Sequence, residues 1–208
     1  MITRIDIESY LALPCRYEEN GVTIECKSAL MAALIDARKV TGRDLNTGKI
    51  INIEETGCWA GTLAYMSLID HIGTVFKKST FEIQNENSFI DALKNFSDLK
   101  EEDINALYAL RCSFVHNYFL YNIHPRNKPQ LTHLFNVTRG QGPVVALPFL
   151  SWNGNVLDRN NITTVNLEAF GNLSEDIYKH LQNLLKDGQL TIKVQEEKFK
   201  SNYLCYQR

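Results

Sequence analysis

The chain has 208 residues, of which 44% are hydrophobic, with 22 basic against 24 acidic side chains. These values suit an ordinary globular protein that buries one core, with or without an appendage, and they argue against a chain-wide nucleic-acid binder. The apolar runs, such as residues 144–150, are too short to cross a bilayer, and the start lacks a basic segment followed by a hydrophobic one. We therefore expect a cytoplasmic protein without a membrane segment.

The cysteines form no CxxC pair, and their odd number leaves one over if the others were bridged. This pattern favours free thiols in a reducing compartment and argues against a structural zinc site. We accordingly expect neither a metal nor another cofactor. The five cysteines are Cys15, Cys26, Cys58, Cys112 and Cys205.

The first part of the chain shows helical periodicity, with apolar residues three and four apart. Gly42 follows the first helical stretch as a stop signal, and Ser88 with Asp91 suggests a capping box at the start of the third. Pro125 ends the last and most apolar helix. Helices are predicted for residues 23–40, 58–76, 88–96 and about 98–124.

After Pro125 the pattern changes to alternation and turns. It predicts strands in residues 131–137 and 144–152, one amphipathic helix over 173–186, and a final strand over 190–194. The expected fold is therefore mainly α. Residues 1–124 would form a helical bundle, and residues 125–208 would form a small α+β extension of antiparallel strands and one helix, packed on the bundle as one structural unit.

Residues 104–157 contain no Asp or Glu, although the net charge of the whole chain is −2. Such a segment favours a locally positive surface that suits a phosphate-bearing ligand. The alternative is that acidic side chains from elsewhere neutralise it in the folded protein. The basic residues of this segment are Arg111, Arg126, Lys128 and Arg139, and its histidines are His116, His124 and His133.

The stretch LYALRCSFVHNYFL, residues 107–120, reads as a buried helix that carries two polar residues. Arg111 takes a position on the apolar stripe, and His116 lies about 140° further around the helix. Because a buried cation costs free energy unless it is paired, Arg111 requires a carboxylate such as Asp70 or Asp91, or a functional reason. The stripe consists of Ile104, Leu107, Tyr108, Phe114, Val115 and Tyr118.

Arginine and histidine together suit one metal-free reaction, the cleavage of RNA by its own 2′-hydroxyl. That reaction needs proton transfer at two oxygens and stabilisation of a charged phosphorane, but no protein nucleophile. Histidine titrates near neutral pH, and the planar guanidinium of arginine matches phosphate oxygens bidentately. Arg111 and His116 are therefore the candidate catalytic residues.

The run Arg111-Cys112-Ser113-Phe114-Val115-His116-Asn117 resembles the Arg-x4-6-His signature of the HEPN superfamily. The resemblance implies a helical bundle, a homodimer that apposes two signature helices, and, in active members, metal-independent endoribonuclease activity. Many active members are toxins or defence effectors, some held by an antitoxin or regulatory protein. Supporting residues would be Cys112, Asn117 and Tyr118, and RNA-binding candidates are Arg126, Lys128 and Arg139.

Other interpretations remain open at this point. Active relatives commonly carry a polar Asn, Asp or His directly after the arginine, where this chain has Cys112. A non-catalytic HEPN-like module that binds RNA, a nucleotide or a protein is therefore the alternative function. Cys112 and His116, four residues apart, also have the spacing of a thiol nucleophile and its base. Finally, Arg111 and His116 can both be structural.

Overall fold

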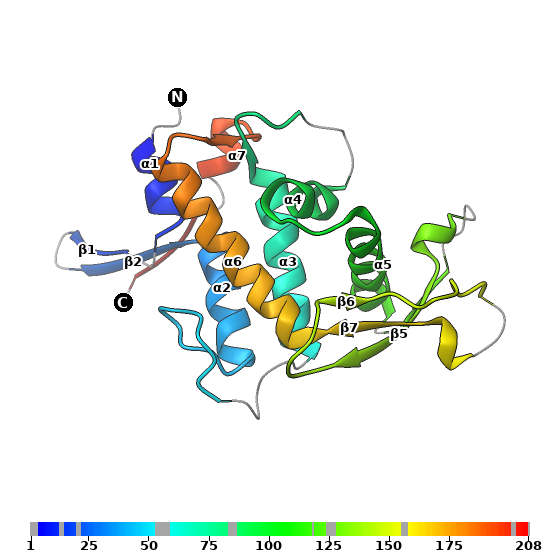
Figure 1. Ribbon diagram of the computed structural model, residues 1–208. Helices are drawn as coiled ribbons and strands as arrows, with labels where there is room; N and C mark the ends of the chain where they lie inside the picture. The colour runs from blue at the N-terminus through cyan, green and yellow to red at the C-terminus, as the bar shows by residue number, and fades with distance from the viewer. Residues whose placement is uncertain are drawn as a thin grey trace.

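The computed structural model describes residues 4–12, 15–19, 22–52, 59–82, 87–117, 119–123, 128–154, 158–200 and 203–207 (Figure 1). The fold is mainly α, as the sequence predicts. Its helices are α1 (Arg4–Tyr10), α2 (Ala29–Val40), α3 (Trp59–Val75), α4 (Ser88–Phe96), α5 (Glu101–Asn117), α6 (Leu167–Lys186) and α7 (Glu196–Lys200), with 3-10 turns at Pro129–Leu131 and Arg159–Asn161. The strands are β1 (Cys15–Glu19), β2 (Val22–Ser28), β3 (Phe76–Lys78), β4 (Tyr121–Asn122), β5 (His133–Thr138), β6 (Val145–Ala146), β7 (Ile162–Asn166), β8 (Leu190–Ile192) and β9 (Tyr203–Gln207).

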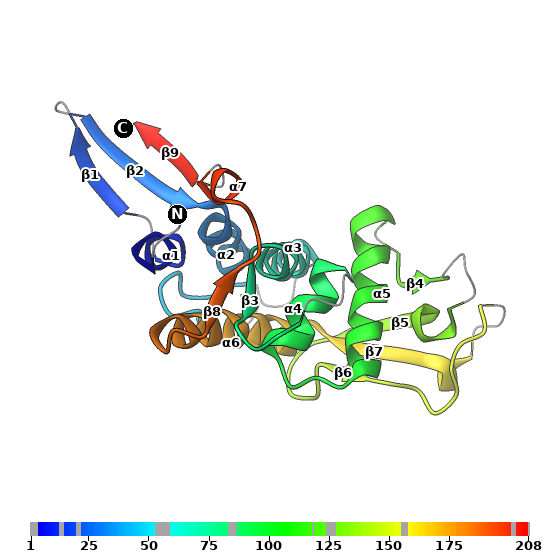
Figure 2. The same ribbon diagram turned by 90° about the horizontal axis from the view of Figure 1, so that it is seen from above.

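Two sheets lie at opposite ends of the helical body (Figure 2). At one end, β2 pairs antiparallel with both β1 and β9, and this register places Cys15, Cys26 and Cys205 in one row of Cα partners. At the other end, the strand order is β4-β5-β7-β6. A short β3–β8 pair lies between them (Figure 2). The spacing of the cysteines along the sequence did not predict that these three would lie in one row.

One hydrophobic core joins the two parts of the chain. It takes Leu34 from α2, Ile69 from α3 and Phe114 from α5, together with Phe170 and Leu181 from α6. Helix α6 crosses the body and packs on α3 and α4 (Figure 1). The predicted C-terminal helix thus lies inside the bundle, and the core runs continuously across residue 124.

A buried ion pair connects α2 to α6. Both side chains are only 3% exposed, and Arg38 donates from Nε and Nη2 to the two carboxylate oxygens of Glu175, at 2.9 and 2.7 Å. The hydroxyl of Tyr65 donates to the same carboxylate at 2.8 Å. Gly48 has φ +71°, and a Cβ there would lie 2.2 Å from Glu175 Oε2. The loop after α2 therefore requires glycine where it closes over this pair.

The helix predicted for residues 23–40 is wrong in its first turn and a half. Residues up to Ser28 belong to β2, because this segment begins with the β-branched residues Val22, Thr23 and Ile24 and pairs with β1 and β9. The helix begins only at Ala29. Ser28 is its N-cap, and its Oγ accepts the backbone N–H of Met31 at 3.1 Å.

The predicted antiparallel sheet is mixed. Strand β5 pairs antiparallel with β4 but parallel with β7, which the sequence pattern did not predict. The strand predicted for residues 144–152 is reduced to β6. Helix α6 starts at Leu167 rather than 173, because the Asn166 side chain accepts the N–H groups of Glu168 and Ala169 and caps it.

The capping box predicted at α4 is also wrong. Asn87 is the N-cap, and its side chain accepts the N–H of Phe89 at 2.9 Å. Ser88 instead donates its hydroxyl to Asp70 on α3, and Asp91 pairs with Lys193 at 2.9 Å. Ser88 and Asp91 thus connect α4 to α3 and to the segment after β8 instead of capping their own helix.

Acidification should destabilise this fold through His71, whose ring nitrogen lies 2.6 Å from the Tyr10 hydroxyl. Burial lowers the pKa of His71 below its ordinary value of 6.5. The unfolded chain therefore binds the proton more readily, and the stabilisation is complete above the unfolded pKa and is lost as pH falls through and below it. Urea unfolding between about pH 7.5 and 5 should show this loss, since an ordinary histidine titrates near 6.5.

The His71→Gln variant supplies the control for this prediction, since an amide does not titrate in this range. It should be less stable at neutral pH but have a flatter dependence of stability on pH. An identical pH dependence in wild type and variant would contradict the assignment to His71.

Candidate functional site

The C-terminal half of α5 has one buried and one open side. Its buried residues cover an arc centred on Leu110, which packs into the core. The remaining arc, here called the open strip, is partly or fully exposed. The open strip consists of Tyr108, Arg111, Cys112, Val115 and His116.

The predicted stripe on α5 is partly wrong in its orientation. Ile104, Leu107 and Phe114 are buried as predicted, but Tyr108 lies on the open strip and Val115 is 46% exposed. The buried face is rotated toward Leu110, and Arg111 therefore lies at the edge of the core. Tyr118 falls outside the described residues.

Arg111 forms an ion pair with Asp70 of α3. Its Nη2 and Nε lie 2.7 and 2.9 Å from the same oxygen, Asp70 Oδ2, while Ser88 Oγ donates to the other oxygen at 2.9 Å. Burial alone would lower the pKa of Arg111, but the hydrogen bond and the charge of Asp70 raise it, so the guanidinium stays cationic. Both side chains keep about a fifth of their surface exposed, 21% and 20%.

Tyr108 and Cys112 occupy the middle of the open strip, between Arg111 and His116. Burial raises the pKa of the Tyr108 phenol, and its interaction with the neighbouring Cys112 raises it further. The phenol therefore stays protonated at neutral pH and can donate a hydrogen bond. Cys112 is a free thiol.

His116 lies in the last turn of α5 and is exposed. Among the described residues no side chain forms a hydrogen bond or ion pair with it. Arg111 and His116 therefore lie at opposite edges of the open strip, about 140° apart around the helix axis and about 7.5 Å apart along it. The structure places both on one accessible face without bringing them into contact.

The other predicted site residues are only partly placed. Asn117 ends α5 but its side chain is outside the described part, as is the whole of Arg126. Lys128 and Arg139 are exposed, and no carboxylate in the described ranges pairs with either. Of the positive charges in the acid-free segment, Arg111 is therefore neutralised by an acid from elsewhere, whereas these two are not.

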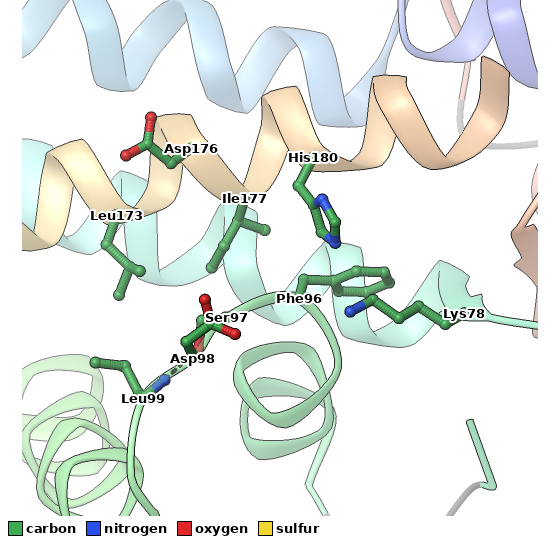
Figure 3. A pocket seen from close by; sticks show the side chains of 9 residues that line it. All are labelled: Lys78, Phe96, Ser97, Asp98, Leu99, Leu173, Asp176, Ile177 and His180. Carbon is green, nitrogen blue, oxygen red and sulfur yellow. Dashed lines mark hydrogen bonds between the residues drawn. The ribbon is translucent and has the colours of Figure 1, made fainter. Parts of the chain in front are cut away.

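A separate cavity of about 510 Å³ lies between α6 and the loop that precedes α5 (Figure 3). Leu173, Ile177 and His180 of α6 point toward it, facing Phe96 and Lys78. Asp98, Asp176 and His180 all line the cavity, but in the described ranges none of them is hydrogen-bonded to another. The open strip is the better candidate site, because its arginine and histidine also match the Arg-x4-6-His pattern.

The described residues contain no group of three or more His, Cys, Asp or Glu side chains that could hold a metal ion. Within the same ranges no helix is long and apolar enough to span a membrane. The chain matches no protein-family model, no curated protein and no solved structure. The interpretation of the open strip therefore depends on its own geometry and on its resemblance to the Arg-x4-6-His signature.

Proposed function

We propose that the protein is a metal-independent endoribonuclease of the HEPN type, with Arg111 and His116 as its catalytic residues. The supporting observation is the open strip of α5. It presents an exposed imidazole and a guanidinium, held cationic by Asp70, on one accessible face. Both groups suit the proton transfer and charge stabilisation that RNA cleavage requires.

In this mechanism His116 takes the proton of the RNA 2′-hydroxyl as the bond between the 2′-oxygen and phosphorus forms. Arg111 stabilises the negative charge of the phosphorane, using guanidinium N–H groups that are not bound to Asp70. The bond between phosphorus and the 5′-oxygen then breaks, and the 5′-oxygen takes a proton from solvent. The products are a 2′,3′-cyclic phosphate and a 5′-hydroxyl, and His116 returns its proton to solvent.

A homodimer completes this site. In one copy Arg111 and His116 lie at opposite edges of the open strip, so they face different sides. Suppose that two copies pack with their open strips together and their α5 helices roughly parallel. The two-fold axis then places the Arg111 edge of one copy beside the His116 edge of the other. Each His116 then shares a groove with Arg111 of the partner subunit. Tyr108, Cys112 and Val115 would form the contact between the copies.

A second candidate function is a non-catalytic module that binds RNA, a nucleotide or a protein at the same face. Two observations favour it: Asp70 already neutralises Arg111, and Cys112 is a weak hydrogen-bonding group where active relatives carry a stronger one. For either function, we propose a cytoplasmic protein, and an antitoxin or other regulatory protein is a candidate partner of the nuclease.

The test is the cleavage of a 5′-labelled structured RNA in EDTA. The wild-type protein should cleave it and leave 2′,3′-cyclic phosphate ends, because the 2′-hydroxyl is the nucleophile. The His116→Ala variant should be inactive, with circular dichroism confirming that it folds. His180→Ala, which removes a histidine from the cavity of Figure 3, is the matched control and should keep the activity.

Equal cleavage by wild type and His116→Ala, or products with 3′-hydroxyl ends, would rule out this mechanism. A folded wild-type dimer that binds the RNA without cleaving it would instead support the non-catalytic module.

A further inference from the structure

Two aromatic side chains form an exposed stack beside the end of α5. The rings of Phe119 and Tyr121 lie 5.1 Å apart between centroids and are nearly parallel, at 14°. They are 45% and 44% exposed. Tyr121 also meets Trp152 edge to face at 6.4 Å. We call Phe119, Tyr121 and Trp152 the aromatic row.

Hydrogen bonds fix this row to the helix that carries the candidate catalytic residues. Ser113 Oγ donates to the backbone oxygen of Tyr121 at 2.6 Å, and the N–H of Phe119 donates to the oxygen of Ser113 at 3.4 Å. Ser113 itself is buried. The row therefore begins three residues after His116 and is held against the last turns of α5.

The row leads to a pocket of about 330 Å³. Trp152, Leu147 and Pro148 form apolar walls, Gln130 and Glu102 supply polar groups, and His133 adds its ring. His133 is held in place, because its Nδ1 lies 2.9 Å from Thr163 Oγ1 and its Nε2 lies 3.0 Å from the oxygen of Gln130. A small pocket lined by an indole, an imidazole, apolar side chains and a few hydrogen-bonding groups suits a planar heterocycle such as a nucleobase.

The charge around the row is complementary to a phosphate backbone. Residues 104–157, which contain the whole row, carry no Asp or Glu. Lys128 is exposed directly before Pro129, which lines the pocket. Among the described lining residues of this pocket Glu102 is the only carboxylate, and it can accept a hydrogen bond from a base amino group.

We propose that the aromatic row is a binding platform for single-stranded RNA, whose bases stack on Phe119 and Tyr121 and enter the pocket beside Trp152. Exposed rings bind the π-faces of unpaired bases, which a duplex conceals. This inference rests on the proposed function and names its substrate class: the unpaired strand next to the scissile phosphate. An apolar surface at this place also fits a second copy of the chain, which the test below separates.

Binding is measured by fluorescence anisotropy with a 5′-fluorescein oligouridine of twelve nucleotides and with an RNA duplex of the same length. The measurements use EDTA, constant salt and a His116→Ala background, so that cleavage cannot interfere. Phe119→Leu and Tyr121→Leu keep an apolar side chain but remove the aromatic face. Each should weaken single-strand binding at least about fivefold and affect duplex binding less. Phe81→Leu, the same change in the loop after β3, is the matched control and should have no effect.

Equal affinities for single strand and duplex, or unchanged binding by both leucine variants, would overturn the proposal. So would a fall of the variants' mass from dimer to monomer in light scattering, which would assign the row to a second copy. If binding depends on the aromatic row but the wild type cleaves no RNA, the result supports the binding platform and contradicts the nuclease function. If the wild type cleaves RNA but the leucine variants bind it as tightly as before, the result contradicts the binding platform alone.

Discussion

The Glu175→Ala variant should lose about 3–5 kcal/mol of its free energy of unfolding, because it leaves the buried Arg38 guanidinium without its counterion. The bond between them is bidentate, and burial costs Arg38 its hydration. The same substitution removes the acceptor of the Tyr65 hydroxyl. Urea unfolding followed by circular dichroism at pH 7 measures the loss.

The neighbouring Asp176→Ala variant is the control for this prediction, since in the described part of the chain Asp176 pairs with Lys179 at the exposed surface. Such a pair contributes about 0–1 kcal/mol, so the control should unfold almost as the wild type does. The double variant Arg38→Met, Glu175→Leu removes both charges together and should recover much of the lost stability. A single variant Glu175→Ala as stable as the control would show that the buried pair is dispensable.

The helices were predictable where local periodicity and long-range packing agree. The sequence pattern placed α3 and α4 to within about one residue, because each buries one continuous face. It failed at β2, where the same apolar residues that suit a helix pair with β1 and β9 instead. The parallel neighbour of β5 lies some thirty residues further along the chain, so no local pattern could reveal it.

The candidate site was predictable in its residue types but not in its environment. The position of Arg111 on an apolar stripe implies a carboxylate partner such as Asp70 or Asp91, and the structure pairs it with Asp70. The sequence did not reveal that Ser88 holds the second oxygen of Asp70, because the same serine also fits a capping box. The exposure of His116 depends on where β4 and the loop after α5 pack, which the helical pattern does not encode.

The shared site of the proposed dimer leads to the second prediction with a large expected effect, on activity. His116→Ala should lower the rate of RNA cleavage by about 10²–10⁴-fold, the contribution of a general base. Arg111→Ala should lower it by about 10²–10³-fold through the loss of charge stabilisation. Each variant alone is therefore nearly inactive. Light scattering would first confirm that both form dimers.

Mixing the two inactive variants should restore activity if each site takes Arg111 from one copy and His116 from the other. When equal amounts of the two variants exchange subunits, half of the dimers become heterodimers. Each heterodimer has one intact site of two, so about a quarter of the wild-type rate should return. If both residues acted within one copy, no heterodimer would contain an intact site and the mixture would stay inactive. Because both residues lie on the open strip but at opposite edges of α5, we expect the recovered activity.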